Sequence, residues 1–136
     1  MTNAIKEIFG ETSAHSRMDY VALSRSGIPM TTFQKILEFT SLQQKEMAAL
    51  LPISERQIAR YDDNHTLKKE VSSHLIQLTE LFDRGYEVFG EEKFQIWIRT
   101  KNRTLGNVTP LTLLDTSIGI QIVTDLIGRI EHGVYS

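Results

Sequence analysis

The polar side chains at the start of one short predicted helix have the chemistry to read base pairs. In residues 44–61, QKEMAALLPISERQIARY, Ser54 is followed three residues later by Gln57, a capping box that begins a helix. An arginine there can bind guanine through two hydrogen bonds, and a glutamate can accept one from cytosine. The residues that we expect to face base edges are Ser54, Glu55, Arg56 and Arg60.

Gln44 and Lys45, on the preceding helix, are placed to contact backbone phosphates, which orient a protein on DNA without reading its sequence. The charge of the chain gives such contacts little general support. Its net charge is −2, residues 1–64 carry seven Lys and Arg against eight Asp and Glu, and residues 65–136 carry eight against nine. Any DNA binding must therefore depend on a few placed side chains and not on a basic surface.

The corner between these two helices has the spacing of a helix-turn-helix. Ala48 is small where two helices must approach closely, and the apolar residues Leu51, Ile53 and Ile58 are placed to bury the corner. This spacing resembles the helix-turn-helix of phage-repressor-like (Xre) proteins, whose second helix faces base edges. Pro52 departs from that pattern, which prefers glycine in the turn. The alternative is that the segment is only two packed helices with a capped corner.

Few residues favour catalysis. The sequence has no cysteine, no glycine-rich phosphate loop and no paired carboxylates beyond the charges of helix surfaces. Glu70 and His74 lie one turn apart, but a metal site needs further ligands, so we interpret them as a solvated ion pair. We predict that the chain is not an enzyme and binds no metal and no cofactor.

The 136 residues are enough for one compact domain or two small lobes, and 40% of them are hydrophobic and 24% charged, as in globular proteins. The absence of cysteine gives no support to secretion. Lys6, Glu7 and Glu11 interrupt the apolar residues near the start, which argues against a signal peptide. Because no apolar stretch approaches membrane-spanning length, we predict a cytoplasmic protein without a membrane partner.

Apolar residues recur at helical spacing along most of the chain, and this pattern predicts an all-α fold. Leu67, Val71, Leu75 and Leu78 fall near one face of a long helix. Thr109, followed by Pro110, is typical of a helix start. The predicted helices cover residues 29–39, 42–51, 54–62, 67–89, 91–99, 110–115 and 118–131.

Three motifs in the second half carry a family resemblance. RGYEVFG at 84–90 ends the long helix, PLTLLDT at 110–116 is followed by Gly119, and RIEHGVY occupies 129–135. Together with the aromatic residues Phe94 and Trp97, they resemble the toxin-binding domain of the Xre/MbcA/ParS-like antitoxin family. With the helix-turn-helix included, the resemblance covers about residues 28–136. It implies a phage-repressor-like helix-turn-helix lobe followed by a small helical toxin-binding lobe.

The resemblance divides the chain into an N-terminal extension (1–27), a helix-turn-helix region (28–64) and a toxin-binding domain (65–136). It also implies a protein partner, a RES-domain toxin that depletes cellular NAD and whose active-site cleft is covered by the C-terminal end of the antitoxin. The polar residues that we expect at this interface are Arg99, Lys101, Arg103, Arg129, Glu131 and His132.

Three residues follow Gly133, which stands where a glycine ends a helix: Val134, Tyr135 and Ser136. We interpret them as a short plug for the toxin's cleft. Tyr135 is its anchor, because tyrosine is enriched at the residues that dominate binding energy. The alternative is a frayed tail, which is common at chain ends.

Three classes of function compete. In the first, the chain is an antitoxin that neutralises its toxin with the C-terminal lobe and represses its own operon with the helix-turn-helix. In the second, it is a dimeric transcriptional regulator without a toxin partner; an enzyme, the third, has the least support. We predict the antitoxin. We also predict a homodimer joined through apolar residues of the C-terminal helices, because two recognition helices then meet two half-sites of the operator DNA. With its toxin, this dimer is expected to form a higher-order complex.

Overall fold

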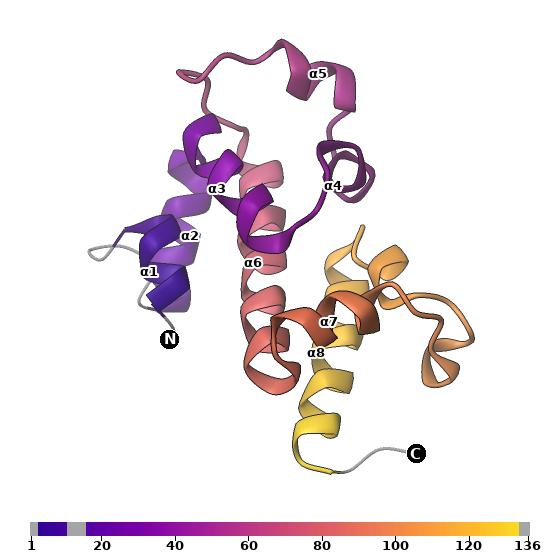
Figure 1. Cartoon of the computed structure of the whole chain (residues 1–136). Helices are drawn as coiled ribbons and strands as arrows, with labels where there is room; N and C mark the ends of the chain where they lie inside the picture. Colours follow the sequence, from indigo (N-terminus) through magenta and orange to yellow (C-terminus); the bar gives the residue numbers. More distant parts are fainter. Residues whose placement is uncertain (1–2, 11–15, 134–136) are drawn as a thin grey trace. The chain divides into compact units, whose positions relative to one another are not determined.

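The computed structural model describes residues 3–10 and 16–133, which are helical with connecting loops (Figure 1). Two isolated bridges, Pro29–Thr66 and Asn102–Val108, are the only β-type pairings within these described ranges. The predicted all-α fold is confirmed. The helices are α1 (Asn3–Phe9), α2 (Arg17–Ser26), α3 (Met30–Thr40), α4 (Gln44–Leu50), α5 (Glu55–Arg60), α6 (Lys69–Phe89), α7 (Glu91–Ile98), the 3-10 helices η1 (Arg103–Leu105) and η2 (Pro110–Leu113), and α8 (Ser117–Glu131).

All seven predicted helices are present, with ends that differ from the predicted ones by at most two residues. Two details differ. The helix expected at 110–115 is the 3-10 helix η2, and Pro29 stands at the N-cap of α3 rather than in its first turn. In the part of the chain that the structure describes, no helix is long and apolar enough to cross a membrane.

The two helices before residue 29 were not predicted from the sequence. The start of α2 was visible in the sequence, because Ser16 and Asp19 form a capping box: each side chain accepts a hydrogen bond from the other residue's backbone N–H. The seven-residue α1 lacks such a signal. It contacts α3 and buries Ile5, Ile8 and Phe9, so its stability comes from tertiary packing and not from local propensity.

The chain forms two compact units, Met1–Glu80 and Leu81–Ser136, which divide within α6. The predicted division at residues 64 and 65 precedes that helix. In the first unit, the largest fully buried side chains come from α3, α4 and α6 and from the segment between α2 and α3: Ile28, Phe33, Ile36, Met47, Leu75 and Leu78.

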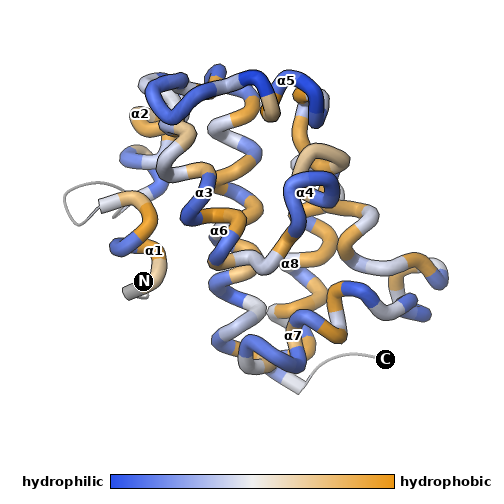
Figure 2. The backbone as a smooth tube through the Cα atoms, turned by 45° about the horizontal axis from the view of Figure 1, so that its top comes forward, coloured by the Kyte–Doolittle hydropathy of each residue, from blue (hydrophilic) through white to orange (hydrophobic). Residues whose placement is uncertain are grey.

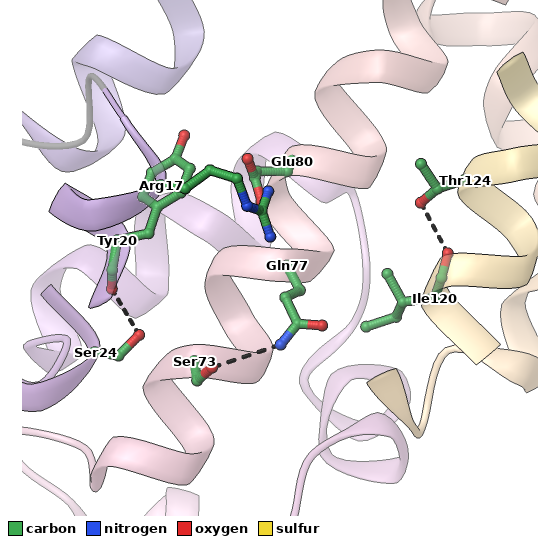
Figure 3. A network of polar contacts seen from close by, with 8 residues as sticks. All are labelled: Arg17, Tyr20, Ser24, Ser73, Gln77, Glu80, Ile120 and Thr124. Atoms are coloured by element: carbon green, nitrogen blue, oxygen red, sulfur yellow. Dashed lines mark hydrogen bonds and ion pairs between the residues drawn. The ribbon is translucent and has the colours of Figure 1, made fainter. Parts of the chain in front are cut away.

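Polar pairs lie beside this core on α2 and α6 (Figure 3). The Ser24 hydroxyl donates to the Tyr20 carbonyl oxygen at 2.8 Å, and Arg17 Nη1 lies 3.8 Å from Glu80 Oε1. Arg17 is far more exposed than Glu80, with 86% of its side chain accessible against 33%. The pair therefore lies at the surface of the first unit, where an ion pair contributes little to stability.

The loop between α5 and α6 is fixed to the start of α3. The N–H of Met30 donates to the His65 carbonyl oxygen, and the N–H of Leu67 donates to that of Ile28, both at 2.9 Å. The buried Ser72 hydroxyl accepts from the Ile28 N–H at 2.9 Å. Because these bonds leave the backbone little freedom, the loop returns the chain from the helix-turn-helix corner to the core in one defined path.

The second unit is built around an aromatic cluster. The buried rings of Phe82 and Phe94 meet edge to face at 5.3 Å, and the half-buried rings of Phe89 and Trp97 stack at 4.9 Å. Gly85 lies under the Phe94 ring, where a Cβ would collide with the ring carbons. From α8, the buried residues are Gly119, Ile120, Val123, Leu126 and Ile127. In Figure 2, α6 and α8 alternate between hydrophobic and hydrophilic stretches, as expected of helices that bury one face.

Two glycines of α8 provide a matched test of this packing. A Cβ on Gly119 would collide with the backbone carbonyl oxygen of Leu113, whereas a Cβ on Gly128 would meet nothing within 4 Å. Gly119→Ala should lower the free energy of unfolding by about 1–3 kcal/mol, as overpacking does. Gly128→Ala should raise it by up to about 1 kcal/mol, because alanine favours helix. Urea unfolding followed by circular dichroism measures both, and equal effects of the two substitutions would contradict the close approach.

Candidate functional site

Side-chain caps define the helix-turn-helix corner in the first unit. The Ser54 hydroxyl accepts from the Gln57 N–H at 3.1 Å, and Gln57 Oε1 accepts from the Ser54 N–H at 3.2 Å. The predicted capping box is confirmed. Glu46 serves in the same way at the start of α4, where its carboxylate accepts from the Gln43 N–H at 3.0 Å. Both helices of the corner therefore begin at fixed positions in spite of their short length.

The buried residues of the corner are those that the sequence suggested. Leu51 and Ile58 are buried, Ile53 and Ala48 are partly buried, and α4 and α5 contact each other. Pro52 is exposed in the turn, and Leu51 before it is extended, so a proline is accommodated without loss of a helical hydrogen bond. The geometry of a helix-turn-helix is thus present.

The residues expected to contact DNA lie on the outside of this corner. Glu55, Arg56 and Arg60 of α5 are exposed, as is Lys45 of α4, whereas Gln44 is partly buried. Figure 2 shows α5 and the loop after it as mostly hydrophilic. Ser54 is also exposed, but its hydroxyl already accepts the capping hydrogen bond from the Gln57 N–H. Arg56 and Arg60 are one turn apart and share a face of α5.

In the second unit, one predicted contact residue is held by a chain of side-chain hydrogen bonds. The Arg99 guanidinium donates to Gln95 Oε1, and Gln95 Nε2 donates to the Tyr86 hydroxyl at 2.8 Å. Sequence reasoning did not assign a role to Gln95 or to the Tyr86 hydroxyl. The spacing of Gln95 and Arg99, one helical turn apart, was the available signal.

The following loop holds the other two cations of this group. Lys101 and Arg103 are exposed, and between them Asn102 organises the loop. Its side chain accepts from the Thr104 N–H at 2.9 Å, and its own N–H donates to the Val108 carbonyl oxygen at 2.9 Å. The loop is therefore a hydrogen-bonded turn that presents its cations from a defined backbone.

The second predicted group lies on the last turn of α8. Arg129 and His132 are exposed, and with Arg84 of α6 they line an open hollow in this unit. The Glu131 carboxylate forms an ion pair with Arg84, another residue of the second unit. Gly133 ends the helix with φ of 71° and donates its N–H to the Ile130 carbonyl oxygen, as predicted. Figure 1 shows this turn and the loop at 101–107 as two separate parts of the unit.

Val134, Tyr135 and Ser136, the expected plug, lie outside the described residues. Within the described ranges, no group of three or more histidine or acidic side chains is placed to hold a metal ion.

The interpretation of His74 as a solvated partner of Glu70 is wrong in one respect. The His74 side chain is buried, with 8% of its surface exposed, because it lies on the inner face of α6.

Two protein families match these two parts of the chain. Residues 19–80 match the antitoxin Xre-like helix-turn-helix domain, and residues 84–133 match the antitoxin Xre/MbcA/ParS C-terminal toxin-binding domain. The chain is 30% identical over 117 residues to the antitoxin Xre of Yersinia enterocolitica, which covers 82% of this chain and 78% of the relative. It is 29% identical over 118 residues to the antitoxin Xre of Photorhabdus laumondii, covering 85% and 80%.

A chain in the crystal structure of the MbcT–MbcA toxin–antitoxin complex of M. tuberculosis has the same fold. It has a TM-score of 0.59 and 23% identity, over 76% of this chain and 93% of that one. The fold defines a helix-turn-helix protein with a helical C-terminal domain. The chain belongs to the Xre/MbcA/ParS antitoxin family, a type II antitoxin family whose C-terminal domain is the toxin-binding one. This membership agrees with the prediction that the chain is not an enzyme.

The hydrogen bonds that link Arg99 through Gln95 to the partly buried Tyr86 lead to a prediction for the Tyr86 hydroxyl. Burial raises the pKa of Tyr86 from 10.0 to about 12, although the hydrogen bond from Gln95 acts in the opposite direction. Because the folded-state pKa is raised, the stabilisation from the neutral phenol is present below about pH 10 and is lost as the pH rises towards 12.

Absorbance of tyrosinate at 295 nm tests this for Tyr86. The wild-type chain and Tyr86→Phe should titrate alike around pH 10, and their difference should appear only near pH 12. A difference that already develops around pH 10 would show that the phenol is solvated.

Proposed function

We propose that the chain neutralises a RES-type, NAD-depleting toxin through its C-terminal domain and the residues after Gly133, and represses its own operon through the helix-turn-helix. The observation that carries this proposal is the match of residues 84–133 to a toxin-binding domain. That match includes both groups of exposed polar residues in the second unit. The likeness to a chain of a toxin–antitoxin complex supports the same role.

The two groups give the proposed toxin interface its chemistry. Arg99, Lys101 and Arg103 offer three cations from one segment, and they fit an acidic surface of the toxin. The last turn of α8 leads directly to Val134, Tyr135 and Ser136, the proposed plug. Tyr135 offers a large aromatic ring of the kind that dominates interface energies when it fills a pocket.

The proposed repressor role depends on the exposed face of α5. Arg56 and Arg60 lie on a helix of six residues that is held at its start by a capping box. Among the described residues, no ion pair is formed by Arg56 or by Lys45, so their charges are available to DNA. The proposal assigns base reading to Arg56 and phosphate binding to Lys45.

The proposed dimer is supported by two exposed isoleucines that form an apolar stripe on α8. Ile118 and Ile122 are one turn apart and 72% and 44% exposed. A second copy of the chain would cover this stripe and present two recognition helices to two half-sites.

Light scattering of Ile118→Glu tests the dimer. The wild-type chain should be a dimer at micromolar concentration, and the substitution should shift it to monomer, because a buried unpaired carboxylate is costly at an interface. The exposed Gln121→Glu on the same helix adds the same charge beside the stripe and should leave the dimer intact. A wild-type monomer would contradict the dimer.

A chain that stops at Gly133 tests the plug. The N–H groups of His132 and Gly133, which donate to the Gly128 and Ile130 carbonyl oxygens, are both retained in a chain that stops at Gly133. Neutralisation should be lost while folding and DNA binding persist, and Tyr135→Ala alone should weaken toxin binding by about 2 kcal/mol.

Co-expression with the toxin encoded by the adjacent gene, read as growth and as co-purification, measures this prediction. A complex that co-purifies but is toxic would place binding on the helical unit and inhibition on the plug. Full protection by the shortened chain would mean that residues 134–136 are a frayed end. If no toxin co-purifies with the full chain, the alternative of a regulator without a toxin partner is favoured.

Two substitutions distinguish base reading from phosphate binding. Arg56→Ala should weaken binding to the preferred operator by about 1–3 kcal/mol and relax specificity at one base pair. Lys45→Ala should weaken binding to all sequences alike and reduce the salt dependence. Fluorescence anisotropy with operator and scrambled duplexes measures both. Unchanged binding in both variants would mean that the corner is only structural.

A further inference from the structure

The carboxylate of Glu131 and the guanidinium of Arg84 form a two-point ion pair. Glu131 Oε2 accepts from Arg84 Nη1 at 3.1 Å, and Glu131 Oε1 is paired with Arg84 Nη2. The two residues are 47 positions apart, and the pair joins α6 to the last residue of α8. A bidentate pair fixes the orientation of both groups, which a single charge contact does not.

The last turn of α8 has little apolar packing of its own. Leu126 and Ile127 are the final buried residues of the helix, and Ile130 is only partly buried. Arg129, Glu131 and His132 are exposed. Among the described residues, the ion pair with Arg84 is a polar side-chain contact that joins this turn to α6 within the second unit.

The pair is also partly shielded from water. The two side chains are 38% and 35% exposed. Arg84 lines the open hollow together with Thr124, Asp125 and Arg129, and the His132 imidazole lies 3.8 Å from Glu131 Oε1. A charge substitution at either position therefore acts on a defined local arrangement and not on a freely mobile surface side chain.

We propose that the Arg84–Glu131 pair fixes the direction of the last turn of α8 and thereby positions residues 129–133 for the toxin. Glu131 is then a positioning residue and not a toxin contact. This inference rests on the proposed function of the C-terminal domain. It gives a role to Arg84, which the sequence placed in a family motif but not in the binding site.

Charge exchange separates positioning from direct contact. The variants are Arg84→Glu, Glu131→Arg and the double variant that carries both changes, each in the full chain. Their affinities for a catalytically inactive form of the toxin encoded by the adjacent gene are measured by titration calorimetry. Each single change should weaken toxin binding about fivefold or more, because like charges then repel each other and the last turn of α8 must be ordered when the toxin binds. The double variant restores the pair with exchanged charges and should recover most of the affinity.

Amide hydrogen exchange of the free chain supplies a readout that does not depend on the toxin. Residues 130–133 should exchange faster in both single variants and return to the wild-type rate in the double variant. Arg84→Lys keeps the charge but loses the fork and should fall between the wild type and Arg84→Glu. Arg17→Gln, which removes the exposed arginine of the Arg17–Glu80 pair in Figure 3, is the matched control and should leave toxin affinity unchanged.

Two results would overturn the inference while the proposed function stands. If the losses of the two single variants multiply in the double variant, Arg84 and Glu131 contact the toxin separately. If exchange at 130–133 accelerates but toxin affinity does not change, the position of the last turn is irrelevant to binding. A wild-type chain that fails to bind the toxin contradicts the proposed function, and the role of the pair in toxin binding is overturned with it.

Discussion

The apolar face of α6 is the constraint on which both compact units depend. Val71, Leu75 and Leu78 of this helix are buried in the first unit, and Phe82 is buried in the second. Each such side chain contributes about 1.5–3 kcal/mol when fully buried. One helix therefore supplies buried side chains to the cores of both units.

The groups with binding chemistry lie at the ends of elements and not in the middle of this packed framework. Arg56 follows the capped start of α5, Arg99 follows the end of α7, and Arg129 lies in the last turn of α8. The capping box holds the start of α5, and a hydrogen bond to Gln95 holds Arg99. The ion pair between Arg84 and Glu131 holds the last turn of α8. Short helices are marginal by themselves, so local polar contacts decide where their side chains point.

The two proposed binding roles have different physical requirements. In the proposed toxin interface, protein recognition would use an aromatic anchor and a few cations, which do not require a strongly charged chain. DNA binding through the first unit has to work without a basic surface, and with Glu55 beside Arg56 in the recognition helix. Fewer neutralised phosphates mean weaker non-specific binding and a smaller salt dependence. Two recognition helices in a dimer would offset the low affinity of each one.

Local sequence patterns predicted the helical fold and the helix-turn-helix corner. Apolar spacing located seven helices, and the pairs Ser54–Gln57 and Thr109–Pro110 marked helix starts, because caps and periodicity are local signals. The aromatic and C-terminal motifs identified the family. The capping box at Ser16 was also legible, although it was missed.

Other features depend on how distant parts of the chain pack. Helix α1 exists because three apolar residues pack on their surroundings, and His74 is buried because its face of α6 points inward. The requirement for glycine at position 119 comes from the Leu113 carbonyl oxygen, and the pairing of Arg84 with Glu131 spans 47 positions. No local pattern encodes which distant groups meet, since that depends on how the helices pack. Glu131, which the sequence predicted as a toxin contact, forms an ion pair with Arg84 in the structure.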